Sequence, residues 1–154
     1  MNSFRGAYTY SVDDKGRINI PAKFRKVMSP LANGTFVVRR GPDNCLQAFP
    51  LDEWERTEEQ AGQRPEHPQT IRTNRHIRST LSESELDAQG RITLSPLQMQ
   101  IAGITKNVLL IGNRGYIEIW DPERFRQYMG EQDDFNEAYY QSVGSAAPTA
   151  SPGQ

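Results

Sequence analysis

The chain has 154 residues and a mass of 17.5 kDa, which sets an initial expectation of a single domain. Its 18 Lys and Arg residues and 19 Asp and Glu residues give a net charge of −1, which excludes a globally basic nucleic-acid binder. A single cysteine excludes a disulfide framework, and the sequence contains neither a membrane-length apolar run nor a signal-peptide core. We therefore expect a soluble cytoplasmic protein.

The first predicted element is a β-hairpin around the sequence DDKG. Residues 8–12 alternate between apolar and polar side chains, and after the turn Ile18 and Ile20 alternate with Arg17 and Asn19. An Asp side chain stabilises such a turn by binding backbone N–H groups, and a Gly supplies the positive φ that the turn requires. Arg17 therefore leaves the turn on the polar face of the hairpin.

Two helices and two strands are predicted next. They are a helix over residues 22–28 after Pro21, strands over 35–40 and 46–49, and a helix over 51–60. A further helix begins at Pro68, where Arg72, Arg75 and Arg78 form a spiral of positive charge. Two interpretations of this segment remain open, a solvated linker helix and a helix that contacts DNA.

The same order of elements returns in the second half. A hairpin over residues 86–95 precedes a helix that Ser95 caps and Gly103 ends. Strands over 107–112 and 116–120 and a helix over 122–129 follow. The tail over residues 144–154 is rich in Ser, Ala and Pro, and we predict that it is disordered.

The chain contains an internal duplication. VDDKGRINIP (12–21) resembles LDAQGRITLS (86–95), TFVVRRG (35–41) resembles NVLLIGN (107–113), and LQAFPLDEW (46–54) resembles YIEIWDPERF (116–125). Two copies of a β-β-α-β-β-α pattern predict an α+β protein with mostly antiparallel sheets. Two copies are too few for a solenoid, so they suit one pseudo-symmetric domain or two small similar ones.

Charge is distributed unevenly along the chain. Residues 1–43 contain eight basic and three acidic side chains, whereas residues 44–86 and residues 87–154 each contain five basic and eight acidic ones. The net charges are therefore +5, −3 and −3. A nucleic-acid footprint, if present, is expected in the first third of the chain.

The sequence predicts no catalytic site, no metal site and no cofactor. His67 and His76 lie in separate contexts and belong to no metal-binding pattern, and Cys45 lies in a strand-like segment where it is expected to fill core space. Asp13 and Asp14 are better explained by turn formation than by metal binding. On the residues alone, a surface Asp–Arg pair that stabilises a hairpin and a DNA-contacting hairpin tip remain equally open.

The assembled blocks resemble the MraZ family. They are FRGAY (4–8), DDKGRI (13–18), IPAKFR (20–25), CLQAFPLDEWE (45–55), LDAQGRITL (86–94) and VLLIGNRGYIEIWDPERF (108–125). This resemblance covers residues 4 to about 129. It implies two SpoVT/AbrB-like swapped-hairpin modules that form a barrel with pseudo-two-fold symmetry. The modules would span residues 4–56 and 81–129, with a linker helix region over 57–80.

The resemblance also implies which residues bind DNA. The family's DxxxR motif matches Asp13 to Arg17, so Arg17 is the expected contact, oriented by Asp13. Support is expected from Lys15, Arg5 and Asp14. The second motif, Asp87 to Arg91, has Gln89 in place of the lysine and acidic surroundings, and is expected to contribute less.

The function implied by the resemblance is regulation of transcription. Members form rings of eight or twelve subunits and bind direct repeats in the promoter of the bacterial division and cell-wall gene cluster, which this protein is expected to repress. They are cytoplasmic and associate with the nucleoid. A ring-forming scaffold that binds protein without DNA, and a small hydrolase, remain as alternatives.

Overall fold

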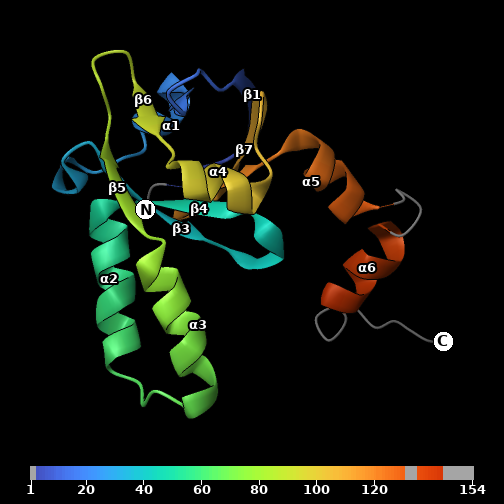
Figure 1. Ribbon diagram of the computed structural model, residues 1–154. Helices are drawn as coiled ribbons and strands as arrows, with labels where there is room; N and C mark the ends of the chain where they lie inside the picture. The colour runs from blue at the N-terminus through green and yellow to red at the C-terminus, as the bar shows by residue number, and fades with distance from the viewer. Residues whose placement is uncertain (1–2, 131–134, 144–154) are drawn as a thin grey trace.

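The computed structural model describes residues 3–130 and 135–143 (Figure 1). The strands of the described residues are β1 Ala7–Ser11, β2 Arg17–Asn19, β3 Thr35–Arg40, β4 Leu46–Pro50, β5 Ser82–Glu85, β6 Arg91–Thr93, β7 Asn107–Asn113 and β8 Tyr116–Trp120. The helices are α1 Ala22–Arg25, α2 Leu51–Gly62, α3 Pro68–Ser79, α4 Pro96–Ala102, α5 Pro122–Met129 and α6 Phe135–Ser142. The tail predicted to be disordered, residues 144–154, lies outside the described residues.

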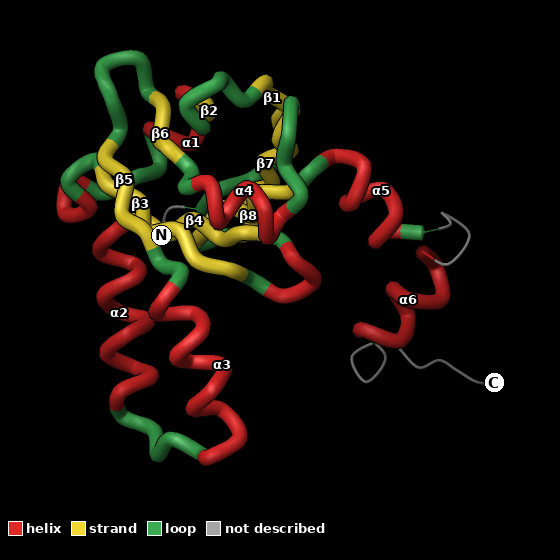
Figure 2. The backbone as a smooth tube through the Cα atoms, in the orientation of Figure 1, coloured by secondary structure: helices red, strands yellow, loops and turns green. Residues whose placement is uncertain are grey.

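Six strands form one antiparallel sheet in the order β1-β7-β8-β4-β3-β5 (Figure 2). The first strand of each repeat pairs with the other repeat: Ala7 of β1 lies opposite Ile111 of β7, and Val38 of β3 lies opposite Ser82 of β5. Strands β1, β3 and β4 of the first repeat correspond to β5, β7 and β8 of the second. The strand order is therefore the same when the sheet is read from either edge. A pseudo-two-fold axis passes between β4 and β8, and the chain has the predicted α+β architecture.

The two predicted turns form as the sequence indicates. The N–H of Gly16 donates to the carbonyl of Asp13 at 3.1 Å, and the N–H of Gly90 donates to the carbonyl of Asp87 at 3.0 Å. Gly16 adopts φ +79°, and a Cβ at this position would lie 2.6 Å from the carbonyl oxygen of Leu94. The turn therefore requires glycine both for its backbone conformation and for close packing against the other repeat.

The strands on either side of these turns do not pair locally, so the predicted hairpins are wrong. The strand that follows each turn crosses to the other repeat, and β2 pairs with β6 in a separate two-stranded ribbon. Ile18 lies opposite Ile92, and both are almost completely buried. The exchange is favourable because it lets one core bury the apolar face of both strands. It is the swapped arrangement that the family resemblance implied.

The longer predicted helices are confirmed. In α4 the hydroxyl of Ser95 accepts a hydrogen bond from the N–H of Gln98 at 3.1 Å, and Gly103 ends the helix at φ 67°. The helix predicted over residues 22–28 ends at Arg25. Residues that precede proline disfavour helical backbone, and Ser29 before Pro30 is extended. Helix α6 was not predicted.

The core lies between the sheet and the β2–β6 ribbon. Phe36 and Val38 of β3 face this core together with Ile18 and Ile92 of the ribbon, whereas Val37 faces the opposite side. The opposite face of the sheet is covered by α2. Figure 1 shows α2 and α3 projecting away from the sheet on the side remote from β6.

Replacing the buried isoleucines of the ribbon should destabilise the whole protein. We expect Ile18→Ala and Ile92→Ala each to lower the free energy of unfolding by about 2–5 kcal/mol, because each leaves a cavity in the core shared by the repeats. Asn19→Ala, on the exposed face of the same strand, should change it by less than about 0.5 kcal/mol. Chemical denaturation followed by circular dichroism measures the differences, and an equal loss in the Ile18 and Asn19 variants would contradict this role for the ribbon.

Candidate nucleic-acid interface

The β2–β6 ribbon brings both DxxxR motifs onto one surface. In a strand, successive side chains point to opposite faces, and the burial of Ile18 and Ile92 turns their neighbours outward. Arg17 lies opposite Thr93 and Asn19 lies opposite Arg91 in the antiparallel register. The outer face of the ribbon therefore presents two arginines on a diagonal, with an exposed amide and an exposed hydroxyl between them.

Asp13 organises the first turn. One carboxylate oxygen accepts hydrogen bonds from the N–H of Lys15 at 3.0 Å and of Arg17 at 2.8 Å. The other accepts from Nε of Arg17 at 2.6 Å. Asp13 thus closes the turn and fixes the direction of the arginine side chain. The terminal amino groups of Arg17 make no hydrogen bond to the described residues. One-third of the Arg17 side chain is exposed to solvent.

The second turn repeats this geometry. Asp87 accepts from the N–H groups of Gln89 and Arg91 and from Nε of Arg91, each at 2.9 Å. Nη1 of Arg91 also lies 3.9 Å from the carboxylate of Asp13. The aspartate of the first repeat therefore contacts the arginines of both, which couples the two motifs into one site.

The hydrogen bonds alter the acidity of both aspartates. The backbone N–H of Arg17 is the largest influence that lowers the pKa of Asp13 below its usual range, and the side chain of Arg17 lowers it further. The backbone and side chain of Arg91 lower the pKa of Asp87 in the same way. Each donor favours the ionised carboxylate. Both aspartates therefore stay negatively charged at neutral pH and hold their arginines in place.

The other predicted contact residues occupy different places. Lys15 and Asp14 are exposed at the tip of the first turn. Arg5 is exposed but lies beyond the opposite end of β1, because it precedes Ala7 whereas the turn follows Ser11. The structure thus brings Lys15 and Asp14, but not Arg5, to the turn that carries Arg17.

Two residues of this surface were not singled out from the sequence. Side-chain alternation turns Asn19 away from Ile18 and Thr93 away from Ile92, but the sequence places each residue in a separate local hairpin. Only the pairing of β2 with β6 places them between the two arginines. Alternation of side chains was the available signal, and the pairing partner was the missing information.

The arginines of α3 lie elsewhere. Arg72, Arg75 and Arg78 are exposed on the helix that projects away from the ribbon (Figure 1). They form no part of the surface that carries Arg17 and Arg91. A contact between α3 and the same stretch of DNA would have to come from a different face of the molecule.

Cys45 lies in the core, remote from the ribbon surface. Burial raises the pKa of Cys45 to about 12, so its thiol is protonated at neutral pH. Within residues 3–130 and 135–143, no group of three or more His, Cys, Asp or Glu side chains is placed to hold a metal ion. In the same ranges no helix is long and apolar enough to cross a membrane.

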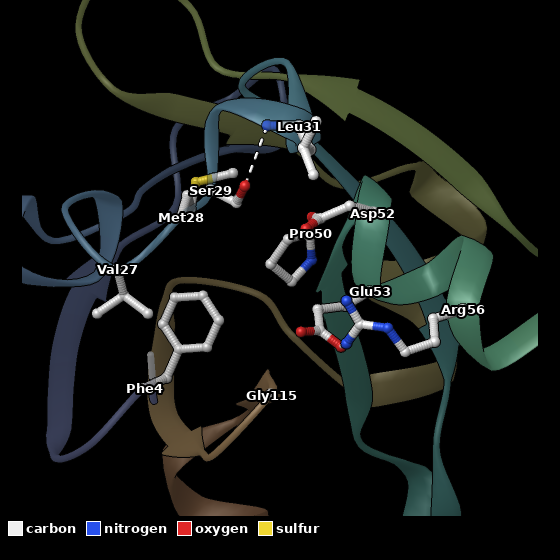
Figure 3. Close-up of a pocket in the computed structure, with 10 residues that line it drawn as sticks. All are labelled: Phe4, Val27, Met28, Ser29, Leu31, Pro50, Asp52, Glu53, Arg56 and Gly115. Atoms are coloured by element: carbon white, nitrogen blue, oxygen red, sulfur yellow. Dashed lines mark hydrogen bonds and ion pairs between the residues drawn. The ribbon is translucent and has the colours of Figure 1, made fainter. Parts of the chain in front are cut away.

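A small hollow lies beside the start of α2 (Figure 3). Phe4, Val27 and Pro50 supply apolar walls, and Arg56 pairs with Glu53 at 2.7 Å on one side. The ten residues that line this hollow include no histidine, cysteine or lysine.

Comparisons with known proteins agree with the duplication. The family model described as "MraZ protein, putative antitoxin-like" matches residues 3–75 and 79–142. A protein of Natranaerobius thermophilus named Transcriptional regulator MraZ is 38% identical over 131 residues, which cover 84% of this chain and 89% of that protein. A protein of the same name from Mycobacterium ulcerans is 34% identical over 143 residues, or 92% of this chain and 97% of that protein.

Removing the aspartate charges should destabilise the protein in a pH-dependent way. The folded pKa of each lies below the unfolded value near 3.8, so ionised Asp13 and Asp87 stabilise the fold above that pH. This contribution is lost as the pH falls through the folded pKa values. We expect the double variant Asp13→Asn, Asp87→Asn to unfold at a lower urea concentration than the unchanged protein at pH 7, and the difference to shrink on acidification.

Asp14→Asn is the matched control for this experiment. Asp14 is the neighbour of Asp13 in the same turn but accepts no hydrogen bond from the described residues. Urea titrations at several pH values provide the comparison. The assignment would be wrong if Asp14→Asn lowered the stability as much as the double variant does, or if the effect of the double variant did not depend on pH.

Proposed function

The chain belongs to the MraZ family, and on this basis we propose that it is a sequence-specific DNA-binding regulator of transcription. Its proposed targets are direct repeats in the promoter of the division and cell-wall gene cluster, where it acts as a repressor. The observation that carries the proposal is the meeting of two DxxxR turns on one exposed ribbon. In cells it is proposed to work in the cytoplasm, in association with the nucleoid.

The ribbon has the dimensions and chemistry for DNA. The major groove of B-DNA admits a two-stranded β-ribbon, and several regulators bind in this way. Asp13 and Asp87 accept side-chain hydrogen bonds only from Nε of the arginines, so the terminal amino groups make no hydrogen bond to the described residues, although Nη1 of Arg91 lies 3.9 Å from Asp13. A planar guanidinium with two such donors can bind a phosphate or the O6 and N7 atoms of guanine. Asn19 and Thr93 add uncharged hydrogen-bonding groups between the arginines.

The first turn is proposed to contribute more than the second. Lys15 occupies the tip of the first turn, and Gln89 occupies the corresponding place in the second. Residues 1–43, which include the first turn, also have a net charge of +5, whereas the rest of the chain is net negative. Arg17 and Lys15 are therefore the leading contacts, Arg91 is a secondary one, and Asp13 and Asp87 position the arginines. Arg5, at the other end of β1, has at most an outlying role.

Affinity is proposed to come from repetition of this ribbon around a ring of eight or twelve subunits. A single ribbon offers few phosphate contacts, so one subunit alone should bind weakly. Repeated sequence boxes let neighbouring subunits bind together, and tethering raises the effective concentration of each further contact. This accounts for DNA binding by a chain whose net charge is −1.

A scaffold that assembles without binding DNA is the second candidate. It is favoured by the large apolar side chains that α5 and α6 leave exposed, among them Tyr128 at 57% and Phe135 at 63%. Exposed aromatic residues are typical of protein contacts. A mobility-shift assay with sheared genomic DNA separates the two, since a scaffold would give no salt-sensitive shift.

Arg17→Ala should weaken binding to DNA that contains the direct repeats. Loss of a bidentate arginine contact costs about 1–3 kcal/mol for each ribbon engaged. If the lost partner is a phosphate, the dependence of log K on log salt should also become shallower by about one for each contact removed. Arg17→Lys, which keeps the charge but not the planar fork, should recover only part of the affinity. Mobility shifts at several salt concentrations measure both quantities.

Arg56→Ala provides the control, because Arg56 is exposed on α2 and pairs with Glu53 away from the ribbon. This variant should bind as the unchanged protein does. The proposed contact is refuted if Arg17→Ala binds the repeats with unchanged affinity at matched salt. Deleting one box from the DNA should weaken binding steeply, whereas equal affinity for one box and several boxes would contradict the role of repetition.

A further inference from the structure

A groove separates α2 from α3 on the face of the sheet opposite the ribbon. Its volume is about 660 Å³, and its lining comes from both helices and from β3. Ile77 and the 8% of Trp54 that is exposed supply apolar wall, whereas Thr57 and Thr70 supply hydroxyl groups. Figures 1 and 2 show the two helices side by side over their length. The groove is large enough for a small organic molecule.

Arg39 is the distinctive charged residue of this groove. Its guanidinium lies 5.5 Å from the ring centre of Phe49 and 5.7 Å from that of Trp54. Its Nε donates to the side-chain oxygen of Gln47 at 2.7 Å. Two aromatic rings and an amide therefore hold the guanidinium in a fixed position at the groove wall.

The charge of Arg39 has no counter-charge in the described structure. No carboxylate of the described residues forms an ion pair with it, and its terminal amino groups make no hydrogen bond there. Burial lowers the pKa of Arg39, yet a guanidinium remains protonated at neutral pH. A half-buried cation without a negatively charged partner is costly, and an anion in the groove would offset that cost.

The second repeat shows that the fold does not require an arginine here. Ile111 occupies the equivalent position, as the alignment of TFVVRRG with NVLLIGN and the pairing of each strand with its hairpin partner both indicate. An apolar side chain thus satisfies the packing of this position in β7. Arg39 therefore has an apolar counterpart in the second repeat.

The other charged residues of the groove restrict what it can hold. Arg64 and Arg78 add positive charge to its lining. Glu58 and Glu66 also line it, and Glu66 accepts a hydrogen bond from Asn74 at 2.9 Å. A highly charged anion would meet these carboxylates. A ligand with one anionic group and an apolar, flat remainder avoids them and can lie against the tryptophan.

We propose that the groove between α2 and α3 binds a small molecule with a flat aromatic body and one phosphate or carboxylate group, with Arg39 and Arg78 holding the anionic group. Trp54 and Ile77 contact the aromatic body. The site is separate from the β2–β6 ribbon and does not depend on DNA binding.

Tryptophan fluorescence of the full chain tests the proposal directly. In the variant Trp120→Phe, Trp54 is the remaining tryptophan and reports on the groove. Adenosine monophosphate and benzoate serve as the phosphate and carboxylate probes, and adenosine and benzyl alcohol are their uncharged counterparts. We expect saturable fluorescence changes with at least one charged probe and none with its uncharged counterpart. Saturable binding of only one probe identifies whether the site prefers a phosphate or a carboxylate. Saturable binding of both shows that the site accepts either group.

Variants locate the binding. Arg39→Met and Arg78→Met should each weaken the binding of the active probe at least tenfold, whereas Arg75→Met, on α3 but outside the lining, should not. Arg39→Met keeps an unbranched side chain against the rings, and Arg78→Met gives the same test should Arg39→Met fail to fold. The double variant Arg17→Ala, Arg91→Ala should bind the probe normally.

Three results would overturn the proposal. The first is the absence of saturable binding of either charged probe at millimolar concentrations. The second is equal weakening by Arg39→Met and Arg75→Met, which would indicate general surface charge. The third is loss of binding in the Arg17, Arg91 double variant, which would place the anion on the ribbon and leave the DNA-binding proposal standing.

Discussion

The pairing of β2 with β6 is the interaction on which the rest of the molecule depends. Three residues from each repeat form it, and the facing isoleucines fill the centre of the core. Because side chains alternate along a strand, burying this pair turns an arginine from each repeat outward. Stability and the exposed polar surface therefore come from the same few residues. A shift of β2 by one residue in this register would expose Ile18 and bury Arg17.

The local features could be predicted from the sequence with good accuracy. Turn residues, helix caps and the duplication were sufficient to predict α4, α5 and the turns from Asp13 to Gly16 and from Asp87 to Gly90. These elements could be predicted because their formation depends on residues that are neighbours in the chain. The partner of a short strand could not be predicted in this way. Residues 17–20 are compatible with pairing to residues 8–12 and with pairing to β6, and only burial of Ile18 against Ile92 decides between them. For the same reason the turn residues Asp13 and Arg17 could be predicted, whereas their approach to Arg91 could not.

The distribution of charge explains how a nearly neutral chain can carry specialised surfaces. Asp13 and Asp87 offset much of the positive charge of the ribbon, but their hydrogen bonds to the arginine side chains use Nε and leave the terminal amino groups without a hydrogen bond among the described residues. Arg39 shows the opposite arrangement, since aromatic rings and an amide hold it without any carboxylate. Each of these arginines contributes the same charge of +1 to the net charge of the chain. The neighbouring acceptor, rather than the charge count, distinguishes the ribbon from the groove.

The exchange of strands between repeats also has a consequence for protein synthesis. Strand β1 leaves the ribosome before its partner residues in β7, which follow about 100 positions later. At roughly 5–20 residues per second, β1 waits about 5–20 seconds before it can pair. Throughout this interval Ile18 and the apolar residues of β3 lack the second half of their core. Until the second repeat is synthesised, the strands of the first repeat are exposed to pairing with the equivalent strands of a neighbouring chain.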